Sequence, residues 1–214
     1  QRSRNANVQV AVKAYKLPED EDVLEMETGE LERLFNRVEK NAMRQMACAH
    51  NNVLRIFGSS RQDGLLRLVM PLIHFGSLDG MLQGTQRAGN QGVLTGSDDH
   101  KRSLALADVF AGVSSALAHI HGFQPPVVHL DVKPANILVD ALPGGMLQPK
   151  LCDFDAARVL EAAAERSATT SYRVAEGTHH YMAPERLRNS PGADAPPADI
   201  YAFAMVMVKC LTGR

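Results

Sequence analysis

The sequence has few cysteines, no long apolar run and almost no excess of either charge. Its three cysteines, Cys48, Cys152 and Cys210, are an odd number without CxxC spacing, which favours a reducing compartment and argues against a zinc site. A net charge of -1 gives no attraction to nucleic acid or to a membrane surface. Charged residues interrupt each apolar run well short of a bilayer span, and Gln1 to Arg4 lack the apolar stretch of a signal peptide. We therefore expect a protein of the cytoplasm or nucleus, without a nucleic-acid partner and without a membrane segment in this chain.

The most informative segment is VVHLDVKPANIL, which runs from residue 127 to residue 138. It places Asp131, then Lys133 two positions later and Asn136 three positions beyond, in a short loop between two apolar stretches. A carboxylate, a cation and an amide in one small volume can orient a hydroxyl, steady a migrating phosphoryl group and hold a metal ion. The segment therefore predicts a phosphoryl-transfer loop.

Three further segments agree with this interpretation in chain order. The segment VQVAVK alternates like a strand and ends on Lys13, KLCDFD places Asp153 at a strand end, and GTHHYMAPE ends at Glu185. Together with the loop they resemble the V-A-I-K strand, the H-R-D-x-K-x-x-N loop, the D-F-G motif and the A-P-E segment of the eukaryotic protein kinase family. The resemblance covers nearly the whole chain.

The resemblance implies an α+β fold of two lobes, with a β-rich N-lobe over about residues 1–70, a hinge over 71–76 and a helical C-lobe over about 77–214. No G-x-G-x-x-G hairpin precedes the lysine strand, and the chain stops soon after DIYAFA at 199–204, which resembles the start of a large C-lobe helix. We therefore expect residues 1–214 to form a partial protein kinase domain that is truncated at both ends.

The resemblance also implies how ATP would be held. Lys13 would contact the α and β phosphates, steadied by a glutamate from a helix that the apolar spacing around Phe35 predicts. Glu39 is the expected partner, and the alternatives are Glu32 or a lysine without a glutamate partner. The adenine ring would lie against backbone and apolar groups of Ala11, Met70, Pro71, Ile73 and Leu138. A lobe-aligning apolar stack would comprise Met43, Ile56, His129 and Phe154.

Four residues would perform the chemistry with Mg²⁺ and ATP. Asp131 would orient the attacking hydroxyl and Lys133 would spread the charge of the transferred phosphoryl group. Asn136 and Asp153 offer the oxygen ligands that Mg²⁺ accepts. Members of the family that phosphorylate serine or threonine carry a lysine at the position of Lys133, so the expected partner is a protein substrate with a Ser or Thr acceptor.

Three positions depart from the family pattern. Asp155 replaces the glycine of D-F-G, which would cost about 1 kcal/mol if the residue needed φ > 0, and it adds a carboxylate that could reach the metal. Leu130 replaces the arginine of H-R-D and cannot pair with a phosphate in the segment Ser167 to Tyr172, so phosphorylation there should have little effect. Ala204 replaces a glycine at the start of the late helix, a minor change.

The favoured interpretation is an active Mg-ATP-dependent Ser/Thr protein kinase, which in its Gly76-Ser77-Leu78 segment looks closest to the tyrosine-kinase-like branch. The alternative is a pseudokinase that binds nucleotide or partners without transferring phosphate. Asp155 and the missing glycine-rich loop favour this alternative, whereas the retained Lys13, Asp131 and Asp153 argue against it. A small-molecule kinase is disfavoured by the A-P-E segment, which in the family shapes a protein-substrate site.

Overall fold

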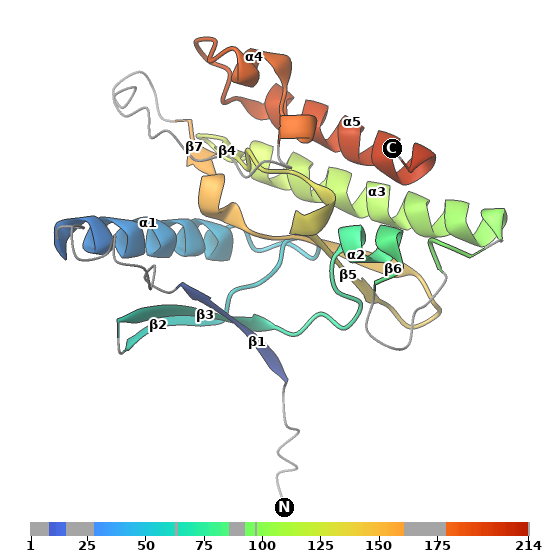
Figure 1. Cartoon of the computed structure of the whole chain (residues 1–214), viewed down its shortest axis with the longest axis horizontal. Coiled ribbons are helices and arrows are strands. Elements are labelled where there is room, and N and C mark those ends of the chain that lie inside the picture. Colours follow the sequence, from blue (N-terminus) through green and yellow to red (C-terminus); the bar gives the residue numbers. More distant parts are fainter. Residues whose placement is uncertain are drawn as a thin grey trace, which may run out of the picture.

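The structure is a computed structural model that describes residues 9–15, 28–62, 64–85, 93–96, 98–160 and 179–213. A small sheet and helix α1 come first in the chain, and helices α3 and α5 lie on the other side of the paired strands β5 and β6 (Figure 1). This is the α+β arrangement expected from the sequence, with strands concentrated early and long helices later.

The first sheet has the strand order β1-β3-β2 and is antiparallel throughout. It comprises β1 (Val10–Tyr15), β2 (Gly58–Gln62) and β3 (Leu65–Pro71). Side chains of β1 alternate between the two faces, as the strand period of two requires. Val10 and Val12 are 44% and 52% exposed, while Lys13 and Tyr15 share the more buried face.

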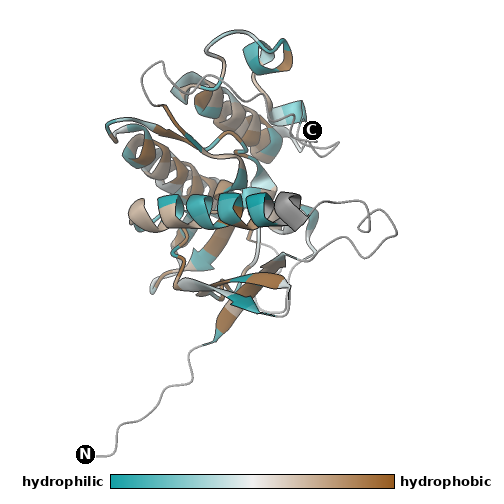
Figure 2. Cartoon of the chain, turned by 90° about the vertical axis from the view of Figure 1, so that its left-hand side faces the viewer, coloured by the Kyte–Doolittle hydropathy of each residue, from teal (hydrophilic) through white to brown (hydrophobic). Residues whose placement is uncertain are grey.

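Helix α1 (Thr28–Ala47) packs one side on this sheet. Phe35, Val38 and Ala42 are buried with apolar side chains of the sheet and of the segment that precedes it. Elsewhere along the helix most residues are hydrophilic, as Figure 2 shows. The predicted helix is therefore present. Met46 follows the same helical spacing as Phe35, Val38 and Ala42, which predicts a buried side chain, but it is 46% exposed.

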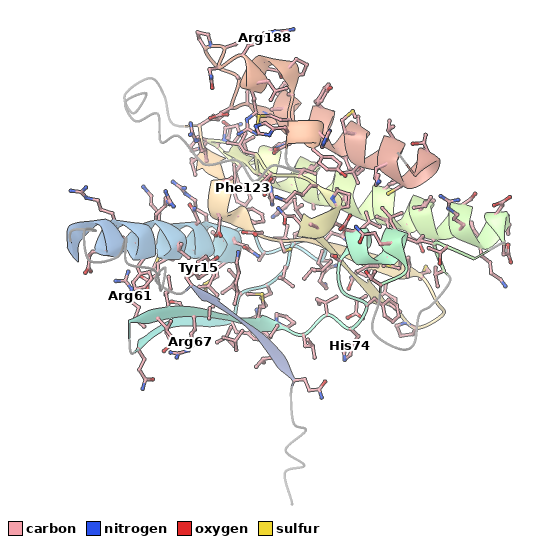
Figure 3. All side chains as sticks on the ribbon, viewed as in Figure 1. Tyr15, Arg61, Arg67, His74, Phe123 and Arg188 are labelled. Atoms are coloured by element: carbon pink, nitrogen blue, oxygen red, sulfur yellow. The ribbon has the colours of Figure 1, made fainter. Side chains whose placement is uncertain are left out.

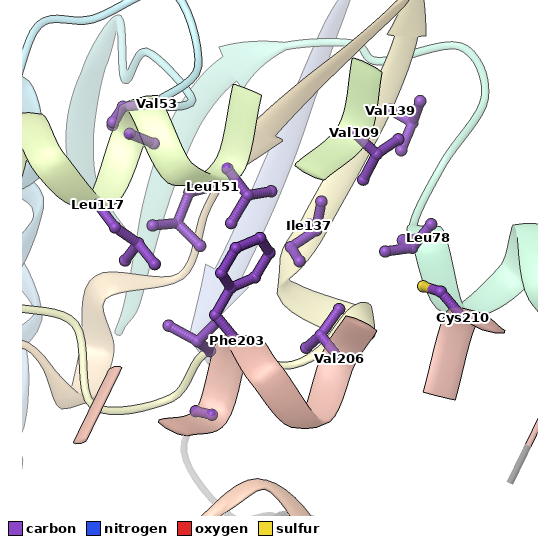
Figure 4. Close-up of a cluster of buried hydrophobic side chains, with 14 of the residues drawn as sticks. Val53, Leu78, Val109, Leu117, Ile137, Val139, Leu151, Phe203, Val206 and Cys210 are labelled. Carbon is purple, nitrogen blue, oxygen red and sulfur yellow. The ribbon is translucent and has the colours of Figure 1, made fainter. Parts of the chain in front are cut away.

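The larger core lies between α3 (Asp99–His121), α5 (Pro196–Thr212) and the hairpin of β5 (Ile137–Ala141) and β6 (Leu147–Leu151). Figure 4 shows side chains from all four elements meeting in this cluster. They include Val109 and Leu117 of α3, Phe203 and Val206 of α5, and Ile137 and Leu151 of the hairpin.

Helix α3 is the one described helix that is long and apolar enough to span a membrane. Its apolar side chains are explained by this core, since Leu106, Val109, Val113, Leu117 and Ile120 are all buried. It also begins earlier than expected. The Gly, Gln, Asn and Ser content of residues 84–103 predicts a loose insertion there. In the structure, however, Asp98 caps the helix by accepting a hydrogen bond from the backbone N–H of Lys101 at 3.1 Å.

The strand after α1 also differs from the prediction. The sequence predicts a strand over residues 53–58 and a turn over the polar run SSRQDG at 59–64, but β2 occupies Gly58–Gln62. The earlier part is drawn away from the sheet because the backbone N–H of Leu54 donates to the carbonyl of Leu151 in β6 at 2.8 Å. This segment therefore joins the first sheet to the larger core.

The remaining elements are short and mostly surround the site described next. They are α2 (Leu78–Gln83), β4 (Val127–Val128), η2 (Pro134–Asn136), η3 (Phe154–Ala156), β7 (Arg158–Val159), η4 (His179–Tyr181) and α4 (Pro184–Leu187).

Candidate active site

The loop that follows β4 is held from below by α5. Asp199 of that helix is completely buried, and its carboxylate accepts hydrogen bonds from the backbone N–H groups of His129 at 2.8 Å and Leu130 at 2.7 Å. His121 Nε2 lies 2.9 Å from the same carboxylate. Leu130 adopts φ = 65°, an uncommon conformation for a side chain of this size. The charge-assisted bonds to Asp199 therefore fix a strained turn.

Asp131, Lys133 and Asn136 converge at the mouth of this loop. Lys133 Nζ lies 2.8 Å from Asp131 Oδ2, and Asn136 Nδ2 donates to the same oxygen at 2.8 Å. Both partners therefore engage one oxygen of the carboxylate. The other oxygen, Asp131 Oδ1, is buried and has no hydrogen-bond partner within the described part of the chain. A buried acceptor without a partner is costly, so this atom is suited to receive a hydrogen bond from a bound hydroxyl.

His129 packs beneath the site. It is completely buried, and its ring meets the ring of Phe154 edge-on with centroids 4.7 Å apart. Nε2 lies 3.0 Å from the carbonyl oxygen of Cys152, and Nδ1 accepts from the backbone N–H of Asp131 at 3.3 Å. Both ring nitrogens of His129 are therefore engaged by the backbone around the site.

Lys13 reaches across from β1 to the segment between β6 and η3. Its Nζ lies 2.9 Å from Asp153 Oδ1 and 3.0 Å from Asp155 Oδ2. Burial alone would lower the pKa of Lys13, but the charges of Asp155 and Asp153 raise it above its usual value. Burial would likewise raise the pKa of Asp153, but Lys13 lowers it. Burial and the neighbouring charge of Asp153 raise the pKa of Asp155.

The expected pair between Lys13 and Glu39 is not formed. Glu39 projects from the other side of α1, where its carboxylate makes two bonds with Arg61 at 2.7 and 2.8 Å. Glu32, the alternative partner, lies 3.4 Å from the same guanidinium. Figure 3 labels Arg61 at the end of the first sheet below α1. The open alternative, a lysine without a glutamate partner from the helix, is the arrangement found among the described residues.

The error came from the phase of the helix. The prediction placed Met43 and Met46 inward, yet Met43 is 66% exposed and does not belong to the apolar stack that was expected to include it. The inward positions are instead occupied by Asn41 and Gln45, which are 3% and 5% exposed. Positions 38, 41, 42 and 45 also follow helical spacing, but residues 41 and 45 are polar. The spacing of apolar residues therefore does not reveal that these two positions face inward.

Two of the five residues predicted to contact adenine line a cavity next to Lys13. Met70 and Leu138 line a cavity together with Lys13, Asn136 and Asp153. Further residues of the expected site follow from the β1-β3 ladder: Ala11 lies opposite Met70, Pro71 closes the strand opposite Val10, and Ile73 is buried just beyond. The cavity thus places Met70 and Leu138, two of the five residues expected to contact adenine, beside Lys13, Asn136 and Asp153.

The residues that surround this cavity suit a magnesium ion with a bound triphosphate. Asn136 turns its amide nitrogen to Asp131, which leaves its amide oxygen for a metal, and the carboxylate of Asp153 lines the same cavity. Among the described residues no group of three or more His, Cys, Asp or Glu side chains could hold a metal alone. Two protein oxygens nevertheless suffice for Mg²⁺, because it completes its shell with water and phosphate.

Two departures from the family pattern acquire a structural explanation. Asp155 lies in η3 and does not have a positive φ; the left-handed residue is Asp153, with φ = 65° and ψ = 70°. The strain expected from replacing glycine is therefore absent at Asp155. Leu130 is buried in a small apolar cluster, and its carbonyl accepts from Arg186 Nη1 at 2.7 Å. Ser167 to Tyr172 and Thr178 lie outside the described residues.

Comparison with known proteins agrees with this geometry. A sequence profile described as "Protein kinase domain" matches residues 1–214. Among curated proteins of Arabidopsis thaliana, the chain is 31% identical over 166 residues to "Lectin-domain containing receptor kinase VI.3" and 34% identical over 166 residues to "L-type lectin-domain containing receptor kinase VIII.2". It is 29% identical over 204 residues to "Receptor protein-tyrosine kinase CEPR1".

These similarities cover 77%, 77% and 89% of this chain but only 22%, 20% and 20% of the three relatives. The chain thus spans about a fifth of the length of the curated relatives it matches. Because the family profile covers every residue and the matching segments build one cavity, the chain belongs to the protein kinase family.

Proposed function

We propose that this chain is the kinase portion of a protein that transfers the γ-phosphoryl group of ATP to serine or threonine hydroxyls of protein substrates. The observation that carries the proposal is the buried, unpartnered Oδ1 of Asp131, held in place by Lys133 and Asn136 through the other oxygen of the same carboxylate. That arrangement presents one acceptor to a substrate hydroxyl and keeps a cation beside it.

Different residues of the site have different roles in the proposed phosphoryl transfer. Asp131 Oδ1 orients the hydroxyl and accepts its proton, and Lys133 stabilises negative charge on the group in transfer. Asn136 and Asp153 would hold Mg²⁺, which supplies charge neutralisation at the phosphates. Lys13 would contact the phosphates, and Met70 and Leu138 bound the adenine end of the cavity.

A pseudokinase is the second candidate, and one observation favours it. Lys13 forms ion pairs with both Asp153 and Asp155. The lysine assigned to the phosphates and the aspartate assigned to the metal, Asp153, therefore already neutralise each other's charge. The pairing is part-buried but leaves about a third of each side chain exposed, so phosphate and metal can compete for these groups.

A cytoplasmic location of the chain and the division into lobes near residues 71–76 are further parts of the proposal.

Acceptor specificity tests the Ser/Thr assignment, since one of the related proteins is named as a tyrosine kinase. The protein is incubated with labelled ATP, Mg²⁺ and three peptides that differ only in carrying Ser, Thr or Tyr. We expect Ser and Thr peptides to be labelled at least about tenfold faster than the Tyr peptide, which corresponds to about 1.4 kcal/mol in barrier. Preferential labelling of the Tyr peptide would contradict the assignment.

A further inference from the structure

Helix α1 faces the cavity without an acidic side chain among the described residues. It contributes Asn41, Ala42 and Gln45 to the lining. Asn41 is nearly fully buried, yet it does not contact Lys13. Its Nδ2 donates to the backbone carbonyl of Asp155 at 2.8 Å, and its Oδ1 accepts from Arg44 Nη1 at 2.8 Å. Helix α1 is therefore hydrogen-bonded to the backbone of Asp155. Among the described residues, its connection to Lys13 runs through Asp155.

The side chain of Asp155 completes the connection. Its Oδ2 lies 3.0 Å from Lys13 Nζ, and Tyr15 donates its hydroxyl to the same carboxylate, 2.9 Å from Oδ2 and 3.0 Å from Oδ1. Lys13 Nζ also lies 4.9 Å from the centre of the Tyr15 ring. Because Lys13 and Tyr15 are two residues apart on one strand, they share a face and both reach Asp155.

We propose that Asp155 is the positioning residue that anchors Lys13 to helix α1, in place of an acidic side chain from the helix itself. The connection runs from Asn41 to the backbone of Asp155, and from the Asp155 carboxylate to Lys13. Asp153 is assigned to Mg²⁺, which would leave Asp155 as the carboxylate that stays bonded to Lys13 when nucleotide is bound. The inference rests on the proposed kinase function, because its consequence is the placement of Lys13 on the phosphates.

The first variants remove the anchor. Asp155→Asn preserves shape and removes the charge, and Asp155→Gly removes the side chain. We expect each to lower kcat/KM for ATP by at least about tenfold and to weaken binding of a fluorescent ADP analogue with Mg²⁺ by at least about threefold, because the lysine loses its charge-assisted bond. Tyr15→Phe keeps the ring over Lys13 and loses only the hydroxyl bond, so we expect a loss of about threefold in kcat/KM.

The second variant moves the anchor to the helix. Asn41→Glu combined with Asp155→Gly places a carboxylate on the inward face of α1 and should restore most of the lost affinity and kcat/KM. Glu39→Gln is the matched control on the outer face, bonded to Arg61, and should change neither value by more than about twofold. Thermal melting of each variant verifies that it is folded.

Each outcome decides the matter. Loss in Asp155→Asn with recovery in the double variant supports the anchor. Tighter nucleotide binding in Asp155→Asn would show that Asp155 competes with phosphate, and loss without recovery in the double variant would indicate metal ligation; either result overturns the proposal. If Asp155→Asn and Asp155→Gly fail to fold, an unchanged Tyr15→Phe also overturns it. A wild-type protein that neither binds nucleotide nor transfers phosphate would refute the proposed function itself.

Discussion

Replacing Asp131 by Asn is expected to lower kcat by at least about 10²-fold while the affinity for Mg-ATP changes little. The amide has nearly the shape of the carboxylate, so it can still meet Lys133 and Asn136. It cannot accept the proton of the substrate hydroxyl, and general-base contributions of this kind are typically about 10²–10⁴-fold. The measurement is steady-state turnover of a Ser peptide beside calorimetric titration with ATP.

The matched control is Asp140→Asn on β5. Asp140 accepts a hydrogen bond from the backbone N–H of Ala141 at 3.0 Å and does not line the cavity. Its replacement removes one carboxylate from the same part of the chain, so kcat should stay within about twofold of the original. An unchanged kcat in Asp131→Asn would show that Asp131 is not the catalytic base, regardless of the kcat of Asp140→Asn.

Replacing Asp199 by Asn should cost about 3 kcal/mol or more in the free energy of unfolding. Two buried backbone N–H groups, those of His129 and Leu130, donate to its carboxylate at 2.8 and 2.7 Å. An amide oxygen can accept from one of them, but the NH₂ group then faces the other donor. Hydrogen bonds to a buried charge contribute about 1.5–3 kcal/mol each, and a donor left without a partner adds its desolvation cost.

Asp108→Asn is the comparison for this prediction. Asp108 of α3 accepts one backbone hydrogen bond, from Leu147 at 3.0 Å, and is less buried than Asp199. We expect a cost of about 1 kcal/mol there. Urea denaturation of both variants gives the two values. Equal destabilisation would mean that the strained turn at Leu130 is held by contacts other than those to Asp199.

Much of the site could be predicted because its residues are close together in the chain. Asp131, Lys133 and Asn136 lie within six positions, so the loop brings them together as soon as its ends are fixed by β4 and β5. The packing of His129 against Phe154 also agrees with its predicted place in an apolar stack. Local spacing carries such predictions well.

The prediction that Glu39 pairs with Lys13 was wrong because it depends on how helix α1 is oriented about its axis. Glu39 and Asn41 are two positions apart, about 200° around the axis of α1, so they lie on nearly opposite sides of the helix. Apolar spacing alone did not fix which side faces the cavity, because Met43 and Met46 fit the side that carries Glu39. The pairing of Glu39 with Arg61 joins residues 22 positions apart. The contact of Lys13 with Asp155 joins residues 142 positions apart, and it required the three-dimensional structure.

The strain expected at Asp155 was wrong for a related reason. The prediction assumed that the third residue of the motif takes the positive φ, whereas the chain places it at Asp153 and begins a 3₁₀ turn at Phe154. Which residue of a short motif turns left-handed depends on the hydrogen bonds around it, here those of Asn41 to the backbone of Asp155 and of Ala157 to Phe154. The sequence of the motif does not contain that information.

The effect of Mg²⁺ on one preparation of the protein tests the central claim most directly. ATP affinity is measured by calorimetry, and phosphate transfer to a Ser peptide is measured in the same samples, with Mg²⁺ and after its removal by a chelator. Because Asn136 and Asp153 are assigned to the metal, we predict that removal weakens ATP binding by at least about tenfold and abolishes transfer. ATP binding that is indifferent to Mg²⁺, with no transfer in either sample, would contradict the account and leave a nucleotide-binding pseudokinase.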